Sequence, residues 1–149
     1  AVDQYDHDGG NDPGDDDGYL TVYVYGNGDE ITADQKSELQ TAMQAQCASI
    51  LTMTVEDATP VSVAVTAAVT AAAGYDTAEL EAAIEDALAS VWSWQTSGFG
   101  ADVEPLDVQA VIESVPGVDS VTSLTLPSTT ASVDFDEFAV IGTVSLTIT

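Results

Sequence analysis

The charge balance constrains this fold more than any other feature of the sequence. The 149 residues include 26 Asp and Glu side chains but only one Lys or Arg, Lys36, which gives a formal net charge of −25. Ordinary domains carry both signs of charge in comparable numbers. A compact chain with this excess repels itself, and salt bridges between side chains cannot offset the repulsion. The fold must therefore depend on a neutral core, for which the 45% content of hydrophobic residues is sufficient.

The same excess predicts a protein adapted to high salt. The Debye length falls from about 8 Å at physiological ionic strength to about 3 Å at 1 M salt, so concentrated salt screens most of the repulsion. Asp outnumbers Glu, and small Ala and Thr residues are frequent, which fits a halophilic protein. An acidic disordered chain is the alternative, but it would lack the apolar periodicity described below.

Uniform negative charge also excludes several kinds of partner. Proteins that bind nucleic acids neutralise phosphates with Lys and Arg, so we expect no direct binding to nucleic acid. No run of about 18 apolar residues occurs, so we expect no insertion into a membrane. Cys47 is the only cysteine, which excludes an internal disulfide, and its apolar position predicts a buried, inert thiol.

Residues 1–18 are predicted to form an acidic Gly/Asp-rich tail or linker, and residues 19–149 a folded domain. The tail is too polar to form a core, so it is either solvated or ordered around cations such as Ca²⁺, which bind clustered carboxylates. Its spacing does not match an EF-hand, and we expect His7 to be an exposed bystander. We expect no cofactor beyond high salt. The candidate ligands for weak Ca²⁺ or Na⁺ binding are Asp6, Asp8 and Asp12.

Periodicity predicts a strand and a helix in the first third of the chain. In residues 19–26, YLTVYVYG, Leu and Val alternate with Tyr and Thr, which indicates a strand with an aromatic second face. Thr32 and Gln35 then form a capping box for a helix that we expect to end between Ser49 and Leu51. The apolar stripe of this helix is Leu39, Met43, Cys47 and Ile50.

The middle of the chain predicts a long strand and a second helix. Residues 61–74, VSVAVTAAVTAAAG, begin with alternating Val and end at a Gly, which favours a strand. Asp76 is the predicted N-cap of a helix that ends near Thr96, before the break SGFG at residues 97–100. The predicted buried stripe of this helix is Leu80, Ile84, Leu88, Val91 and Trp92.

The last third predicts a short helix followed by two strands. Pro105 suits the first turn of a helix, and Pro116-Gly117 ends that helix and turns the chain into a strand at residues 118–126. The final strand is FAVIGTVSLTIT, residues 138–149. The order β-α-β-α-α-β-β predicts a two-layer α+β domain with helices packed on one face of a mixed sheet. The inward side chains are Leu106, Val108, Val111, Ile112 and Val115 on the helix, and Val118, Val121 and Leu124 or Leu126 on the strand.

No catalytic constellation is present in the sequence. His7 and Lys36 are the only basic side chains, and neither lies in a motif that would pair it with a nucleophile. Carboxylate pairs carry no information in a chain with 26 acids. The GNG of residues 26–28 lacks the further glycines and the Lys of a phosphate-binding loop. We therefore expect that the protein is not an enzyme.

Several segments together resemble a known family. They include V-x-V-x-V-x-A-x-V at residues 61–69, V-P-G-V-D-S-V at 115–121 and E-F-A-V-I-G-T-V-S-L-T at 137–147. Over residues 18–149 the chain resembles the carboxy-terminal part of baseplate J-like proteins, the wedge components of contractile phage tails and related injection machines. The larger amino-terminal portion of that family is missing from this chain, and the acidic tail has no counterpart in it.

The resemblance implies a non-enzymatic structural subunit, or a fragment of one, in a virus tail baseplate adapted to high salt. Its partners would be other tail and baseplate proteins and copies of itself, in virions assembled in the cytoplasm of a halophilic host. Because fold-level likeness gives function only by analogy, two alternatives stay open. One is a secreted or surface cation-binding module that uses the acidic tail, and the other is a small halophilic enzyme.

Four aromatic side chains are candidates for contacts with such partners. Tyr23 and Tyr25 lie on the outer face of the first strand, and aromatic residues are enriched at the centres of interfaces. Trp94 lies off the main stripe of the second helix, and Phe99 lies in the SGFG break. The alternative for Trp94 and Phe99 is that they close the end of the core.

Overall fold

The structure is a computed structural model that describes residues 18–26, 28, 30–46 and 51–149. It divides the chain into two compact units, one up to Ala58 and one from Thr59, a boundary that the sequence analysis did not place. The predictions for the acidic tail and for the side chain of Cys47 lie outside the described residues. This includes the candidate cation ligands Asp6, Asp8 and Asp12 and the bystander His7.

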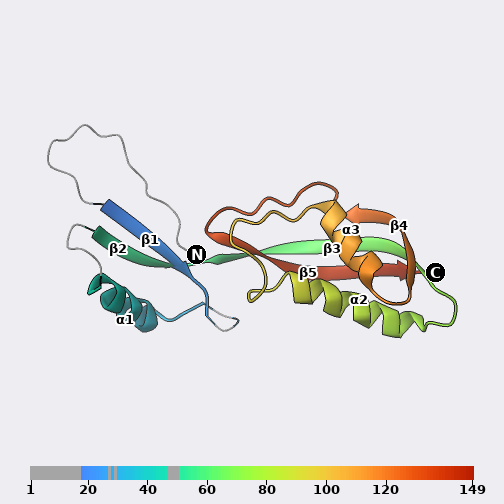
Figure 1. Ribbon diagram of the computed structural model, residues 1–149, viewed down its shortest axis with the longest axis horizontal. Helices are drawn as coiled ribbons and strands as arrows, with labels where there is room; N and C mark the ends of the chain where they lie inside the picture. The colour runs from blue at the N-terminus through green and yellow to red at the C-terminus, as the bar shows by residue number, and fades with distance from the viewer. Residues whose placement is uncertain (1–17, 27, 29, 47–50) are drawn as a thin grey trace. The chain divides into compact units, whose positions relative to one another are not determined.

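The first unit is a β-α-β arrangement (Figure 1). It comprises β1 (Gly18–Val24), α1 (Ala33–Gln44) and β2 (Leu51–Asp57), and the two strands pair in parallel. The predicted capping box is confirmed: the Thr32 hydroxyl accepts the Gln35 N–H, and Gln35 Oε1 accepts the Thr32 N–H at 2.9 Å. The buried residues of this unit are Val22, Met53, Val55 and Ala58.

Two boundaries of this unit differ from the prediction. Helix α1 ends at Gln44, not between Ser49 and Leu51, and Leu51–Asp57 is a strand that was not predicted. The strand alternates buried Met53 and Val55 with Thr and Glu side chains, and pairing with β1 stabilises it. Local apolar spacing beyond Gln44 continued the helical period, but tertiary pairing of the strand determines the structure.

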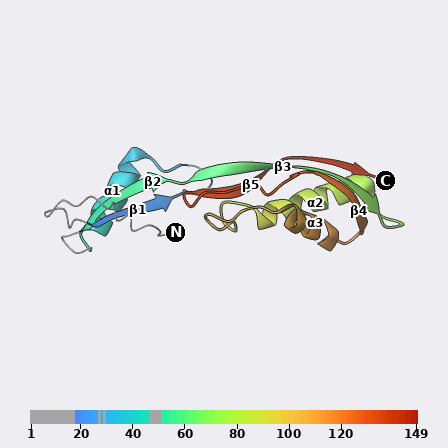
Figure 2. The same ribbon diagram turned by 90° about the horizontal axis from the view of Figure 1, so that it is seen from above.

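The second unit is a three-stranded mixed sheet covered by two helices. Its elements are β3 (Thr59–Ala71), α2 (Thr77–Val91), α3 (Pro105–Ser114), β4 (Val118–Leu126) and β5 (Glu137–Ile148). The strand order is β4-β3-β5, with β3 antiparallel to β4 and parallel to β5. Figure 2 shows α2 and α3 on one side of this sheet. The α+β class and the predicted order of elements are confirmed, with one strand more than predicted.

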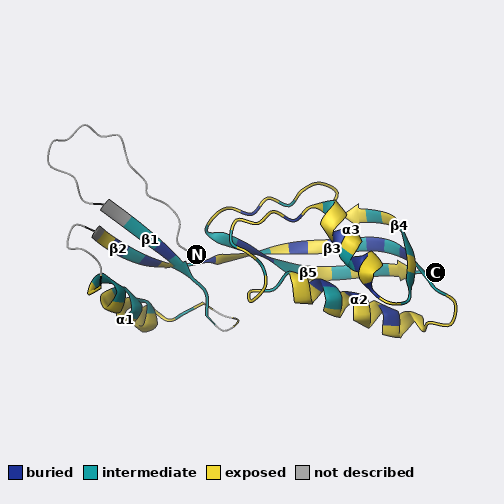
Figure 3. Ribbon diagram, in the orientation of Figure 1, coloured by how far each residue is buried: buried dark blue, intermediate teal, exposed yellow. Residues whose placement is uncertain are grey.

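The core of the second unit lies between the sheet and the two helices, as Figure 3 shows by the buried positions. Asp76 is the N-cap of α2, where its carboxylate accepts the N–H groups of Ala78 and Glu79 at 2.9 and 3.2 Å. The predicted Asp76 cap is thereby confirmed. The side chains that form the centre of the core are Val63, Val65, Ala67 and Val69 from β3, Leu80, Ile84 and Leu88 from α2, and Val108 and Ile112 from α3.

Two predicted inward positions are wrong, Val91 and Leu106, and the choice between Leu124 and Leu126 is settled in favour of Leu124. Val91 is 40% exposed because α2 ends there rather than near Thr96, and the backbone of Trp92 leaves the helical region. Leu106 is 72% exposed because the inward side of α3 passes through Val108 and Ile112 instead. On β4, Leu124 packs against the core and Leu126 is exposed.

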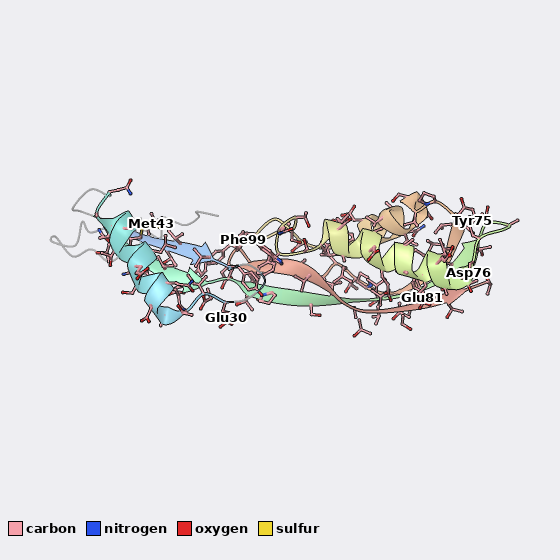
Figure 4. All side chains as sticks on the ribbon, turned by 90° about the horizontal axis from the view of Figure 1, so that it is seen from below. Glu30, Met43, Tyr75, Asp76, Glu81 and Phe99 are labelled. Atoms are coloured by element: carbon pink, nitrogen blue, oxygen red, sulfur yellow. The ribbon has the colours of Figure 1, made fainter. Side chains whose placement is uncertain are left out.

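The Pro116-Gly117 turn joins α3 to β4, as predicted. Gly117 has a φ of 103°, and its carbonyl accepts the Ala72 N–H at 2.8 Å, which fixes the turn beside the end of β3. A Cβ atom at this position would lie 2.7 Å from Cε1 of Tyr75. Tyr75 lies next to Asp76 at the start of α2 (Figure 4). Glycine is therefore required at residue 117 both for its backbone conformation and for the space that the Tyr75 ring occupies.

Replacement of this glycine should separate those two effects. We expect Gly117→Ala to lower the free energy of unfolding by about 2 to 3 kcal/mol, because a positive φ costs roughly 1 to 2 kcal/mol and the ring must also move. Gly74→Ala is the matched control, since Gly74 has a φ of 94° with no atom within 4 Å of an added Cβ. Denaturant titration at high salt measures both variants. Equal losses for the two variants would show that the contact with Tyr75 contributes nothing.

Candidate interaction surfaces

The described carboxylates all lie at the surface. No polar or charged residue in the described part of the chain is buried, and none of its His, Cys, Asp and Glu residues form a group of three that could hold a metal ion. Lys36 and Asp57 form the only ion pair among these residues. The described surface therefore consists of acidic regions and uncharged regions, and it has no basic patches.

Charged side chains are absent from β3 and from β5 beyond Glu137 in the second unit. Neither residues 59–75 nor residues 138–149 include a charged side chain. Within β3 the buried Val and Ala side chains point to the helices, so the alternate side chains point to the opposite face. Residues paired across a sheet point the same way, which adds three residues of β5. We call this set the neutral sheet face: Ser62, Ala64, Thr66, Ala68, Thr70, Val140, Ser145 and Thr147.

This face was not predicted from the sequence. The two uncharged runs were interpreted only as strands, although their lack of charge is unusual in a chain with a net charge of −25. The acids of α2 and α3 lie on the helix side of the sheet, while the sheet itself carries Asp119 in β4 and Glu137 at the start of β5. The signal that could have located the neutral sheet face was therefore the absence of charge at alternate positions of both strands.

Strand pairing places Tyr23, but not Tyr25, on the predicted face. Tyr23 pairs with Glu56 in the two-stranded sheet, next to buried Val22, so it points to the face opposite α1. Tyr25 lies just past the end of β1, and both tyrosines are half-buried. Their position is compatible with an interface, and that role stays a prediction.

Trp94 and Phe99 lie in the segment after α2. Trp94 is 38% exposed, in a hydrogen-bonded turn that follows the helix. Phe99 is half-buried, and its ring packs edge-on against buried Phe138 with 6.0 Å between the ring centroids. The contact of Phe99 fits the alternative in which it closes the end of the core. The structure thus places the four candidate side chains in two different units, Tyr23 and Tyr25 in the first and Trp94 and Phe99 in the second.

Comparison with protein families identifies the second unit. A family model described as the baseplate J-like protein C-terminal domain matches residues 63–147, more than half of the chain. The chain belongs to the baseplate J-like protein family. The matched baseplate J-like domain extends from β3 to β5, so it includes both helices and all three strands of the mixed sheet. A search of curated proteins found no match.

Membership in the baseplate J-like family indicates a structural role in a phage tail baseplate. It also indicates contacts with other tail proteins, and a location in the virion tail. Such a role does not require a catalytic site. Within the described residues, no helix has the length and apolar character needed to cross a membrane. The first unit, with β1, α1 and β2, lies outside the match, although the resemblance predicted from the sequence extended over it.

Proposed function

We propose that this chain is a non-enzymatic structural subunit, or part of one, of a virus tail baseplate that assembles at high salt. The observation that carries the proposal is the family match across the second unit. The net charge of −25 supports the high-salt environment, because only screening by cations makes so acidic a surface compatible with a folded, assembled protein.

The distribution of charge supports assembly through particular faces. Partners adapted to the same salt concentration carry acidic surfaces too, and like charges brought together at an interface cost several kcal/mol. The neutral sheet face avoids this cost because its side chains are Ser, Thr, Ala and Val, none of them charged. Tyr23 and Tyr25 offer larger contact areas in the first unit and are the side chains expected to contribute most to binding.

The tyrosine contact is tested by replacing Tyr23 and Tyr25 with Ser together. We expect the double variant to fold at high salt and to be incorporated into tails about tenfold less than the parent, because aromatic residues contribute most of the energy at interface centres. Incorporation is measured from the amount of the chain in purified tails, and folding from thermal melts.

The matched control replaces both tyrosines with Phe, which retains the rings and removes only the hydroxyl groups. This control should assemble close to normally. If the Ser variant loses its stability while its folded fraction assembles normally, the tyrosines belong to the core and the interface assignment for this face is wrong.

A further inference from the structure

The first unit contains a groove of about 920 Å³ between α1 and β2. On the helix side it is lined by positions three or four residues apart, such as Lys36, Gln40 and Gln44. On the strand side it is lined by three consecutive residues, 55–57. Successive side chains of a strand point to opposite faces of a sheet. Three consecutive lining residues therefore place the groove along the edge of β2 rather than over one face.

That edge of β2 pairs with no strand in the described part of the chain. The only strand that pairs with β2 among the described residues is β1, and the Met53 N–H donates to Gln44 Oε1 at 2.8 Å. On the opposite edge, the Ala58 N–H donates to Val24 of β1. Because backbone groups alternate between the two edges of a strand, the N–H and C=O groups of Val55 point with those of Met53, into the groove. No described residue pairs with Val55 there, so the groove presents unused strand hydrogen bonds.

The first unit also has a small core. Helix α1 contributes no buried residue, and a two-stranded sheet is marginally stable unless further strands or packing complete it. A third strand on β2 would lie beneath the face of α1 that lines the groove. It would bury this face and satisfy the open edge at the same time.

The groove has an unsatisfied acceptor at one end. Lys36 Nζ pairs with Asp57 Oδ2, while Asp57 Oδ1 is shielded from solvent and has no hydrogen-bond partner among the described residues. Glu56 also lines this end, although its side chain points with Tyr23 to the other face of β2, so two carboxylates lie near one ammonium group. The local charge favours a basic donor beside Asp57.

We propose that the groove binds an extended segment of another protein as a third strand on β2, with a Lys or Arg side chain next to Asp57. Binding by strand addition uses backbone hydrogen bonds for affinity and individual side chains for specificity. A second copy of this chain is disfavoured as the occupant. If two β2 edges paired about a twofold axis, the two α1 helices would lie on the same face of the combined sheet and would compete for the same space next to the axis. The proposal concerns the unit outside the family match and does not depend on the baseplate role.

The test uses a synthetic peptide as the probe. The peptide is as long as β2, 7 residues, alternates Thr and Val, and ends in Arg; a second version begins with Arg, so that both strand directions are covered. The full chain is titrated in about 2 M KCl and followed by amide NMR, where salt screens the exposed charges. We expect saturable binding, with the largest shifts and slowed hydrogen exchange at the Val55 and Asp57 amides.

Two protein variants and one peptide variant complete the experiment. Ser37→Trp fills the groove and should weaken binding at least about tenfold, whereas Ala42→Trp, on the same helix but outside the lining, should leave it unchanged. Replacing the peptide Arg with Glu should weaken binding about threefold or more, and Asp57→Asn should remove that preference. The proposal is overturned if neither peptide binds saturably, if the shifts lie away from β2, or if the two Trp variants bind equally well.

Discussion

The folded chain should lose about 3 to 5 kcal/mol of stability when KCl is lowered from about 2 M to about 0.1 M, because the Debye length grows roughly 4.5-fold over this range. The corresponding fall in melting temperature is about 15 °C, on the scale of a few degrees per kcal/mol for domains of this size. The cause is that 26 acids face one Lys, and the single ion pair of the described residues, Lys36 with Asp57, is partly exposed at both side chains. Thermal melts at a series of KCl concentrations measure the effect.

A neutralised variant shows whether acid repulsion causes this dependence. Glu81 and Glu85 are exposed on α2, away from the neutral sheet face, and their replacement by Gln removes two charges without touching the core. We expect a shallower dependence of the melting temperature on salt in this variant. A melting temperature of the parent chain that stays flat across the whole range would contradict adaptation to high salt.

Ile84→Ala should destabilise the second unit by about 3 to 4 kcal/mol, the usual cost of removing a large aliphatic side chain from a core that cannot collapse around the cavity. Ile84 has no exposed surface and lies in the cluster formed by α2, α3 and the sheet. Val91→Ala, on the same helix but 40% exposed, is the matched control and should cost less than about 1 kcal/mol.

The two tryptophans make this measurement specific to one unit. Both Trp92 and Trp94 belong to the second unit, so their fluorescence during denaturant titration reports its unfolding alone. A loss for Ile84→Ala no larger than that for Val91→Ala would show that α2 is not packed against the sheet as described.

Sequence reasoning predicted the second unit well because its apolar residues follow the periods of its elements. Residues 118–126 were predicted as a strand from the Pro-Gly turn and from alternation, and β4 has these bounds. Helix α2 was predicted from its Asp76 cap and from the apolar stripe of Leu80, Ile84 and Leu88. These three apolar side chains are buried. In both elements, local pattern and tertiary packing favour the same structure.

The first unit was less predictable because its packing is weak. Helix α1 buries no residue, so its apolar stripe was a poor guide to where it ends, and β2 depends on pairing with a strand far away in the sequence. The groove could not be predicted for the same reason. It exists only because β2 pairs with β1 on one edge and with no described strand on the other.

The parallel pairing of β3 with β5 has a mechanical consequence. The ladder extends from Thr59 opposite Glu137 to Val69 opposite Ile148, so the chain enters β3 at one end of the ladder and leaves β5 at the other. A pulling force applied at Thr59 and Ile148 therefore acts along the strands, and the hydrogen bonds between them share the load instead of breaking one after another. A domain with this connectivity resists stretching along its strands, which suits a component of a machine that contracts.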